Sequence, residues 1–407
     1  MKKISVIYAG WGDRFQLGTL ADDGKELLFE YSPEALKRGL ELSPHKLPLS
    51  DKAYGDFPDH QLKLPGLVSD SLPDGWGMLL MDRLFRKQGK RPEQISPLDR
   101  LAFIGDTAMG ALAFEPAEGG ALTHEDVELL ELARETREVL DDESEDLLRK
   151  LVRMGGSPHG ARPKVLVNFD RSNNKMANWE DAEGIPMLVK FPAQTEHKEV
   201  CAIEAMYGRI ALACGLSVPS TEYFDLNKDL SAFGIERFDR FEGMRVPMHT
   251  AAGAAHVNFR IPQLDYINLL RLTRRMTKDE REVLQAYKRC VFNVVFNNRD
   301  DHSKNFSFLF GKDGRWRFSP AYDLTYCVGP GGEHQMDICG EAREPSRQHL
   351  LELAKKGGIP EKVAIESIER IAEVATRFNA FTEQFPIRNA TIKEIEAAVR
   401  TNQGRMT

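Results

Sequence analysis

The first part of the chain consists of short apolar runs separated by turn residues, a pattern that predicts short strands. An apolar run covers 4–8, and two further runs at 16–20 and 26–31 flank Asp-Asp-Gly at 22–24, which is typical of a hairpin turn. Ser-Pro at 32–33 marks the start of a helix, because proline is favoured at the first helical position. The pattern predicts a β-rich N-terminal region.

Helical spacing of apolar residues appears next. It predicts an amphipathic stretch over 71–84 and a further helix that begins at Ser96 and ends at Gly105. The segment 116–146 is acidic and rich in glycine and glutamate. We therefore place a domain boundary in this segment and expect it to include a solvent-exposed helix.

The following part of the chain mixes strand and helix patterns. Apolar runs at 165–169, 187–191 and 234–239 predict strands. Between them, residues 199–214 predict a helix, and Gly215 stands where a C-cap glycine belongs. This alternation is that of a sheet covered by helices.

After about residue 255 the pattern is helical. Thr-Lys-Asp-Glu at 277–280 is a capping-box signature, and it precedes apolar residues at helical spacing as far as Val295. Further helices are predicted over 348–356, 360–384 and 391–401. Together the patterns predict an α+β fold.

We expect three parts in the chain: a β-rich N-terminal subdomain at 1–115, an α/β lobe at 116–250 and an all-α lobe at 251–407. The 407 residues are enough for two or three domains with sizeable cores.

Composition narrows the function classes. The net charge of -7 and a pI near 5.9 argue against generic binding of nucleic acid or of a membrane surface by the whole chain. The basic run Arg271, Arg274, Arg275 and Lys278 is either a local patch or the solvated face of a helix end. The five cysteines form no CxxC pair, which favours free thiols in a reducing compartment. Neither a signal peptide nor a membrane-spanning run is visible, so we expect a cytoplasmic protein that does not bind membranes.

The segment 298–305 carries the most specific chemistry. In it Arg-Asp is followed, after four residues, by Asn305, which is the spacing of a protein-kinase catalytic loop. In such a loop the aspartate, here Asp300, receives the substrate proton and the asparagine holds magnesium. A second aspartate, Asp323, follows an apolar approach and suits a magnesium site. Two other interpretations remain open: a plain polar loop, or a metallohydrolase that uses Asp300, Asp301 and His302 as ligands.

The other parts of a kinase site come earlier, in the expected order. Residues 155–164 form a Gly-rich loop that is not a Walker A motif, and a simple hairpin turn is its alternative interpretation. Lys190 lies inside an apolar strand, so it is either at a solvent-facing edge or buried with a partner. Glu204, in the next helix, is the expected partner, unless it is a surface residue near the helix start.

These motifs together resemble the HipA family of bacterial toxin kinases. Ser157-x-x-Gly160-Ala161-x-x-Lys164 is similar to the family's Gly-rich loop, and Val189-Lys190-Phe191-Pro192 is similar to its strand lysine. Glu236-Arg237-Phe238-Asp239-Arg240 is similar to the family's hinge, and Tyr322-Asp323 to its magnesium site. Residues 1–115, with Leu72-Pro73-Asp74-Gly75, resemble its N-terminal subdomain.

The resemblance implies roles for single residues. Asp300 would be the catalytic base, and Asn305 and Asp323 would bind Mg²⁺. Lys190, held by Glu204, would contact the phosphates of ATP. The phosphate-covering loop would contribute Gly156, Ser157, Gly160 and Lys164, the backbone of Glu236 and Phe238 would contact adenine, and Asp239 and His302 would contact the ribose. Ser157 matches the serine that the family autophosphorylates.

The resemblance also implies a biological role. Family members phosphorylate a protein serine, target an aminoacyl-tRNA synthetase, and pair with a small helix-turn-helix antitoxin through which they contact DNA. The sequence therefore predicts a serine/threonine kinase toxin, and the alternative is a pseudokinase that acts as a co-repressor or antitoxin-like binding module.

Overall fold

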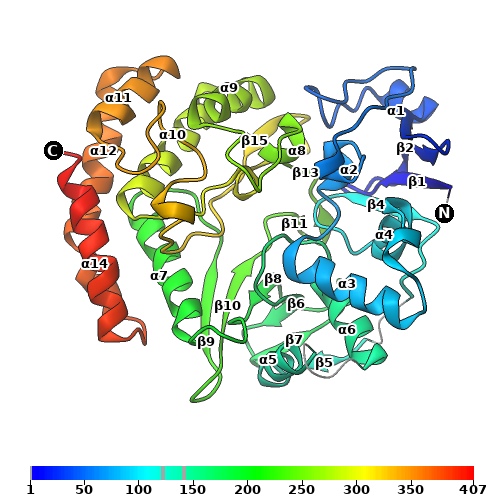
Figure 1. The fold of residues 1–407 in the computed structure, drawn as a ribbon, viewed down its shortest axis with the longest axis horizontal. Helices are drawn as coiled ribbons and strands as arrows, with labels where there is room; N and C mark the ends of the chain where they lie inside the picture. The colour runs from blue at the N-terminus through cyan, green and yellow to red at the C-terminus, as the bar shows by residue number, and fades with distance from the viewer. Residues whose placement is uncertain (1, 121–123, 140–143) are drawn as a thin grey trace.

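A four-stranded antiparallel sheet forms the N-terminal subdomain. The computed structural model describes residues 2–120, 124–139 and 144–407, and Figure 1 shows this sheet on the right. Its order is β3-β2-β1-β4. The strands are β1 (Lys3–Tyr8), β2 (Phe15–Asp22), β3 (Leu27–Tyr31) and β4 (Leu112–Glu115). The predicted hairpin is confirmed, because β2 and β3 pair across the turn at 22–24.

Helices accompany this sheet, and those with a capping serine begin where the sequence predicts. They are α1 (Pro33–Arg38), α2 (Gly66–Ser69), α3 (Gly75–Lys87) and α4 (Pro97–Ile104). The Ser32 hydroxyl accepts a hydrogen bond from the backbone N–H of Ala35 and so caps α1. Ser96 caps α4, and Gly105 follows its last residue, as expected.

A six-stranded sheet lies at the centre of the molecule, in the order β5-β7-β6-β8-β10-β9. Its strands are β5 (Asp126–Val127), β6 (Lys164–Asp170), β7 (Lys175–Ala177), β8 (Ile185–Lys190), β9 (Thr221–Asp225) and β10 (Ser231–Glu236). The accompanying helices are α5 (Leu129–Glu138), α6 (Glu145–Gly155) and α7 (Glu199–Ala213). The predicted strands at 165–169 and 187–191 and the helix before Gly215 are confirmed. The strand predicted at 234–239 lies three residues earlier, as β10, because the chain leaves the sheet in a turn after Glu236.

The acidic segment differs from its prediction. Its helix α5 is not simply solvent-exposed, since Leu129, Leu132 and Ala133 are buried. The charged residues lie on the other face of the helix, so the acidic composition conceals an apolar stripe. Residues 121–123 and 140–143 of this segment lie outside the described residues.

The C-terminal lobe is mainly helical. Its helices are α8 (Ala251–Ala255), α9 (Tyr266–Thr277), α10 (Glu280–Val295), α11 (Arg347–Lys356), α12 (Glu361–Thr376), α13 (Phe378–Thr382) and α14 (Asn389–Gly404). It also holds two short strands that were not predicted, β14 (Ser307–Phe310) and β15 (Trp316–Phe318). β14 pairs on one side with β13 (Met248–Thr250), just before the lobe, and on the other side with β15.

The predicted capping box at 277–280 is shifted. Helix α9 runs through Thr277 and ends because Lys278 adopts the left-handed conformation. Asp279 therefore caps α10, and its carboxylate accepts from the N–H of Arg281 at 2.9 Å. The basic run on α9 is the solvated end of a helix: Arg271, Arg275 and Lys278 are exposed.

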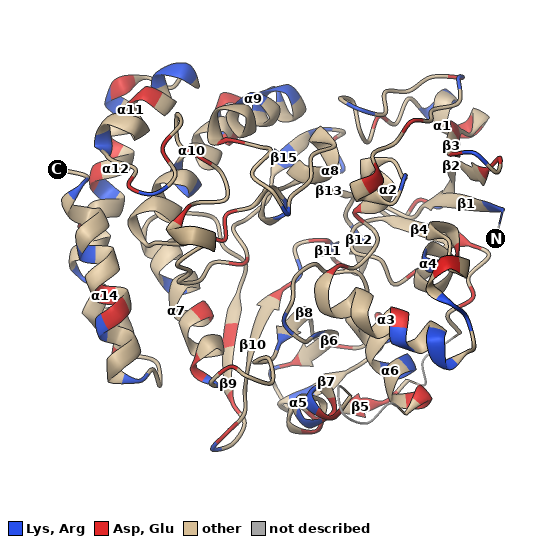
Figure 2. Cartoon of the chain, in the orientation of Figure 1, with Lys and Arg blue, Asp and Glu red and all other residues tan. Residues whose placement is uncertain are grey.

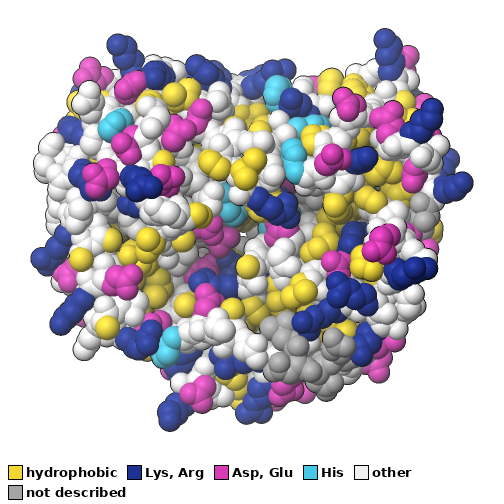
Figure 3. Space-filling view, in the orientation of Figure 1, with side chains coloured by type: hydrophobic (Ala, Val, Ile, Leu, Met, Phe, Trp, Pro, Cys, Tyr) yellow, Lys and Arg dark blue, Asp and Glu magenta, His cyan; other side chains and the backbone are white. Residues whose placement is uncertain are grey.

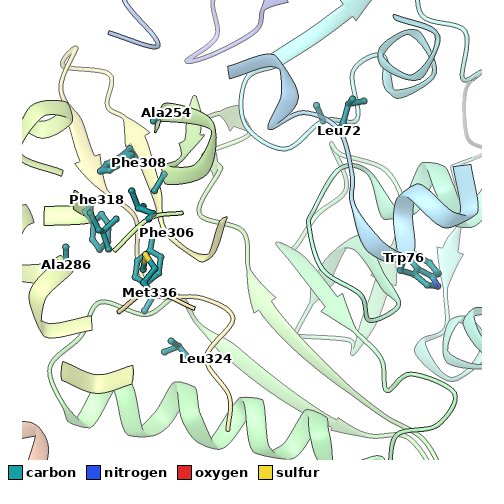
Figure 4. Close-up of a cluster of buried hydrophobic side chains, with 14 of the residues drawn as sticks. Leu72, Trp76, Ala254, Ala286, Phe306, Phe308, Phe318, Leu324 and Met336 are labelled. Atoms are coloured by element: carbon teal, nitrogen blue, oxygen red, sulfur yellow. The ribbon is translucent and has the colours of Figure 1, made fainter. Parts of the chain in front are cut away.

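Aromatic side chains fill the core of the C-terminal lobe (Figure 4). Phe306, Phe308 and Phe318 lie together there, with Met336 close by. Phe306 directly follows the segment 298–305, so this core fixes the end of the predicted catalytic loop.

Smaller elements and the surface complete the fold. A hairpin of β11 (Arg240–Phe241) and β12 (Met244–Arg245) follows the central sheet. The described residues also include the 3₁₀ helices η1 (Asp59–Gln61), η2 (Pro92–Gln94), η3 (Ser303–Asn305) and η4 (Pro330–Gly332). Acidic and basic residues are mixed along α11, α12 and α14 (Figure 2). Within the described ranges, no helix has both the length and the apolar character needed to cross a bilayer.

Candidate active site

A pocket opens between the central sheet and the C-terminal lobe. Figure 3 shows the visible face hollowed near its centre, where acidic, basic and histidine side chains gather. The pocket is lined by residues from both sides: Met109, Pro158, His159, Leu188, Lys190, Ile235, Glu236, Arg237, Phe238, Met248, Lys304, Asn305, Tyr322 and Asp323. The lining thus brings together five residues of the predicted nucleotide site: Lys190, Glu236, Phe238, Asn305 and Asp323.

Lys190 stands at the end of β8 and bridges the two sides of the pocket. Its Nζ lies 2.5 Å from Glu204 Oε1 on α7 and 2.6 Å from Asp323 Oδ1. The predicted Lys190–Glu204 ion pair is thus present. Of the two positions that the sequence left open for Lys190, the structure shows the second: the side chain is buried with an anionic partner and does not lie at a solvent-facing edge.

The charges of this cluster support one another. Burial lowers the pKa of Lys190, but the carboxylates of Asp323 and Glu204 more than offset this, so the pKa is raised and the ammonium stays charged. Burial raises the pKa of Asp323, and Lys190 outweighs it, which leaves the pKa of this carboxyl below its ordinary value. Asp323 is therefore an ionised oxygen donor inside the pocket.

The segment 298–305 folds into a loop that presents Asp300. The side-chain amide of Asn305 donates to the carbonyl oxygen of Asp300 at 2.7 Å, which closes the loop. The carboxylate of Asp300 is half-exposed and lies 3.8 Å from His302 Nε2. Burial raises the pKa of Asp300; the His302 charge opposes this and the Asp323 charge adds to it. A carboxylate with a raised pKa suits a proton acceptor.

Asp301 points away from the pocket. It is buried, and its carboxylate is hydrogen-bonded to the hydroxyl of Tyr266 at 2.7 Å and to His334 Nδ1 at 2.8 Å. The N–H of Gln335 donates to it as well, at 2.8 Å. Asp301 therefore cannot join Asp300 and His302 around one metal. Across the described part of the chain, no group of three or more His, Cys, Asp or Glu side chains is placed to hold a metal ion.

The Gly-rich loop follows α6. Gly156 and Gly160 both have positive φ, which only glycine adopts without strain. Ser157 is fully buried, and its hydroxyl accepts from the N–H of Met109 at 2.7 Å. Lys164 pairs in register with Lys190 across β6 and β8. Burial and the charge of Lys190 lower the pKa of Lys164 to about 8.

Asp239 departs from its predicted position. Its carboxylate is fully buried and accepts from the guanidinium groups of Arg237 and Arg240 at 2.9 and 2.8 Å, and from the N–H of Gly110 at 2.8 Å. The predicted contact with ribose is not available in this arrangement, because Asp239 instead joins the hinge to the N-terminal subdomain. Glu236 and Phe238 do line the pocket. His302 lies beside the Asp300 carboxylate, and its Nδ1 is buried without a hydrogen-bond partner in the described residues.

Three residues of the site were not predicted. Asp74 accepts a hydrogen bond from Gly160 and pairs with Lys304, and Arg162 lies 3.6 Å from Glu204. Lys304 lies in the predicted catalytic loop and Arg162 in the Gly-rich loop, so their positions in these motifs could have marked them as site residues. Asp74 is 86 residues away from Gly160, and nothing local marks that contact.

The residues present fit a magnesium–nucleotide complex. Asp323 and Asn305 supply oxygen atoms, which Mg²⁺ prefers. The amide NH₂ of Asn305 donates to the loop, which leaves Oδ1 as the side-chain atom that would bind a cation. Lys190 lines the pocket, and Lys164 is its cross-strand neighbour, so two cationic groups lie close to the position that phosphates would need.

A strand lysine bound to a helix glutamate, facing a loop that carries an aspartate and an asparagine, defines a kinase-like site on a two-lobed α+β fold. Comparison with protein families is consistent with this class. Residues 156–378 match the HipA-like C-terminal domain and residues 10–115 match the HipA N-terminal domain. The chain belongs to the HipA family.

Individual relatives agree with the family. Putative kinase Y4mE of Sinorhizobium fredii is 31% identical over 261 residues, which cover 57% of this chain and 57% of that protein. Putative kinase Y4dM of the same organism is 23% identical, over 80% of this chain and 78% of its own length. The chain thus aligns with little more than half of the length of Y4mE.

A solved structure gives the fold of the whole chain. HipA of Shewanella oneidensis MR-1, determined in complex with HipB and operator DNA, superposes with a TM-score of 0.73 at 19% identity. The match covers 98% of this chain and 97% of that one. At this identity the likeness shows the fold, and it confirms the predicted α+β, HipA-like architecture.

Proposed function

We propose that this chain is an ATP- and Mg²⁺-dependent serine/threonine protein kinase that acts as a growth-arresting toxin. The observation that carries the proposal is the position of Lys190, which contacts Glu204 and Asp323 at once. This contact joins the strand that would hold the phosphates to the carboxylate that would hold the metal. A passive core salt bridge would not need a third partner that lies in the pocket.

The proposed chemistry divides among few residues. Asp300 accepts the proton that the acceptor serine hydroxyl loses as its oxygen attacks phosphorus. Asn305 and Asp323 hold Mg²⁺, which when bound neutralises charge on the transferring phosphate. Lys190 and Lys164 orient the ATP phosphates, together with Gly156 and Gly160.

The base and ribose ends of the nucleotide are assigned to the hinge side of the pocket. The backbone of Glu236 and Phe238 contacts adenine, and His302 is the residue that we assign to the ribose. Phe238 stands 5.2 Å, between ring centroids, from Tyr322, which gives the pocket an aromatic wall.

The partners follow from the family. The Shewanella HipA structure contains HipB and operator DNA. By analogy we propose a small helix-turn-helix antitoxin that contacts DNA for this chain, with an aminoacyl-tRNA synthetase as the protein substrate. The net charge of -7 supports DNA contact mainly through such a partner.

Transfer of the labelled γ-phosphate of ATP to protein tests the kinase proposal. The purified chain should incorporate label with Mg²⁺ and lose this activity when Mg²⁺ is chelated. Nucleotide binding without any transfer would favour the pseudokinase alternative. Hydrolysis of a phosphomonoester without ATP would favour the metallohydrolase, which the position of Asp301 already disfavours.

Ser157 is proposed as the autophosphorylation site and as a self-inhibition switch. Its hydroxyl is buried against Met109, so a phosphate of roughly -1.5 to -2 charges cannot be accommodated there. Phosphorylation would release the loop and weaken ATP binding. Phosphosite mapping after incubation with ATP, followed by measurement of ATP affinity, tests this. Phosphate found only elsewhere, or unchanged ATP binding by the Ser157-phosphorylated form, would refute the switch.

A further inference from the structure

Asp74 occupies a helix-capping position but does not cap its helix. It immediately precedes α3 in extended conformation, where an aspartate normally accepts a hydrogen bond from its own helix. No such bond is present. Instead, Oδ1 accepts from the N–H of Gly160 at 2.5 Å, and Oδ2 accepts from Lys304 Nζ at 3.1 Å. The Asp74 carboxylate therefore does not stabilise the start of α3, and it makes two contacts with residues far away in the sequence instead.

The two contacts reach two different loops of the proposed site. Gly160 belongs to the Gly-rich loop, whereas Lys304 belongs to the loop that carries Asp300 and Asn305. The side chains of Asp74 and Lys304 are only 8% and 11% exposed. Because these groups are largely shielded from water, their charge-assisted hydrogen bond is stronger than one at the surface. One carboxylate of the N-terminal subdomain therefore joins both loops between which the phosphates must lie.

The backbone after Asp74 also touches the Gly-rich loop. Gly75 has a φ of +46°, and a Cβ at this position would lie 2.5 Å from the carbonyl oxygen of Gly160. The N–H of Trp76 donates to the same oxygen at 3.3 Å. A side chain at position 75 would push the two segments apart, so the close approach depends on this glycine.

A second segment of the N-terminal subdomain holds the other end of the loop. The N–H of Met109 donates to Ser157, and the next residue, Gly110, donates to Asp239 of the hinge. The stretch between Ser157 and Gly160 is thus held at both ends by residues outside the central sheet.

From these contacts we propose that Asp74 is a positioning residue that clamps the Gly-rich loop against the catalytic loop, so that the N-terminal subdomain sets the affinity of the nucleotide site. This inference rests on the proposed function, because it concerns the same nucleotide pocket. Asp74 need not touch the nucleotide; it acts through the backbone of Gly160 and the ammonium of Lys304.

Hydrogen–deuterium exchange of the full chain tests the clamp directly. Asp74→Asn retains the shape but not the charge, and Asp74→Ala removes both contacts. Exchange of the amides at 157–161 should increase from wild type to Asp74→Asn to Asp74→Ala, by about tenfold or more in the last, since a hydrogen bond to a charged group is lost. Affinity for a fluorescent ATP analogue with Mg²⁺ should decrease in the same order.

Asp82→Asn is the matched control. Asp82 lies on the same helix and pairs with Arg100 at 2.6 Å, away from the Gly-rich loop. In the Asp82→Asn variant, hydrogen exchange at 157–161 and nucleotide affinity should equal those of wild type. Lys304→Gln is the second test variant, because it removes only the catalytic-loop contact. It should lower nucleotide affinity, with less exchange at 157–161 than Asp74→Ala.

The readouts separate a clamp from a merely structural residue. In phosphate transfer, Asp74→Ala should raise KM for ATP more than it lowers kcat. Unchanged exchange at 157–161 would overturn the inference, and so would increased exchange with unchanged nucleotide affinity. A wild-type chain that binds nucleotide but transfers no phosphate would refute the kinase proposal, whereas exchange and affinity would still decide on the clamp.

Discussion

The two loops that face each other across the pocket are held in different ways. The catalytic loop at 298–305 is fixed mainly by its own lobe, apart from the contact of Lys304 with Asp74: Asn298 donates to Asn293 at 3.0 Å, and Asp301 binds Tyr266 and His334. The Gly-rich loop is supported in part by the sheet that it precedes, since Lys164 of β6 donates to the carbonyl oxygen of His159 and Arg162 pairs with Glu196. Its backbone and its serine are also bound by Asp74 and Met109 of the N-terminal subdomain.

This difference separates two tasks of the site. A loop buried within one lobe is preorganised once that lobe folds, which suits the atoms that perform chemistry. A loop that is held by another subdomain can be released without unfolding either part, which suits control of nucleotide binding. The predictions below probe the two loops in turn.

Asp300→Asn should have the largest effect on activity. The amide cannot accept the serine proton, so kcat should decrease by roughly 10²–10⁴-fold. Because the Asp300 side chain is half-exposed, the unfolding midpoint should remain that of wild type. Labelled-phosphate transfer and urea denaturation measure the two quantities. Wild-type activity in this variant would remove Asp300 from the site.

Lys190→Met should cause the next largest loss of activity. It removes the cation between Glu204, which is buried, and Asp323, which is half-buried, and leaves their two carboxylates without it. We expect a decrease of about 10²–10³-fold in phosphate transfer, the range found when one electrostatic donor is removed from a site. Nucleotide binding measured in parallel distinguishes lost affinity from lost chemistry. Transfer at the wild-type rate would mean that this lysine does not serve the phosphates.

Asp301→Asn should damage stability rather than chemistry. The neutral side chain loses charge-assisted bonds from buried partners, which is worth about 2–3 kcal/mol in the free energy of unfolding. Urea denaturation measures this, with Asp300→Asn as the control. Equal stability of the two variants would contradict the view that the catalytic loop is fixed by its own lobe.

The catalytic loop should determine how the rate depends on pH on the acid side, and the Gly-rich loop should determine how ATP affinity depends on pH on the alkaline side. Asp300 must be ionised to accept a proton, and its pKa is raised, so kcat/KM should fall about tenfold per pH unit below that pKa. Lys164 has a pKa lowered to about 8 and is charged below it, so ATP affinity should weaken as pH increases beyond 8. Rate and binding profiles from pH 4 to 10 check both limbs. An acid limb at the ordinary aspartate pKa, or an ATP affinity independent of pH above 8, would contradict the corresponding assignment.

The domain boundaries at 115 and 250 and the cytoplasmic location stay predictions. The elements themselves were largely predictable, because caps and periodicity are local signals. The cap of α10 shows where such local signals fail. The sequence favoured Thr277 as the cap, but Asp279 caps the helix, because α9 extends to Thr277 and ends at the left-handed Lys278.

By itself the sequence determined the order of the chemical parts. The Gly-rich loop, Lys190, Glu204, the catalytic loop and Asp323 could be read in that order, and the pairing of Lys190 with Glu204 followed because a buried ammonium requires an anion. Only the tertiary structure decided that Asp301 faces the core, that Asp239 joins the hinge to the N-terminal subdomain, and that Asp74 reaches the Gly-rich loop. The physical reason is that these three carboxylates find partners far away in the sequence, and contacts of that kind depend on how subdomains pack rather than on any local pattern of residues.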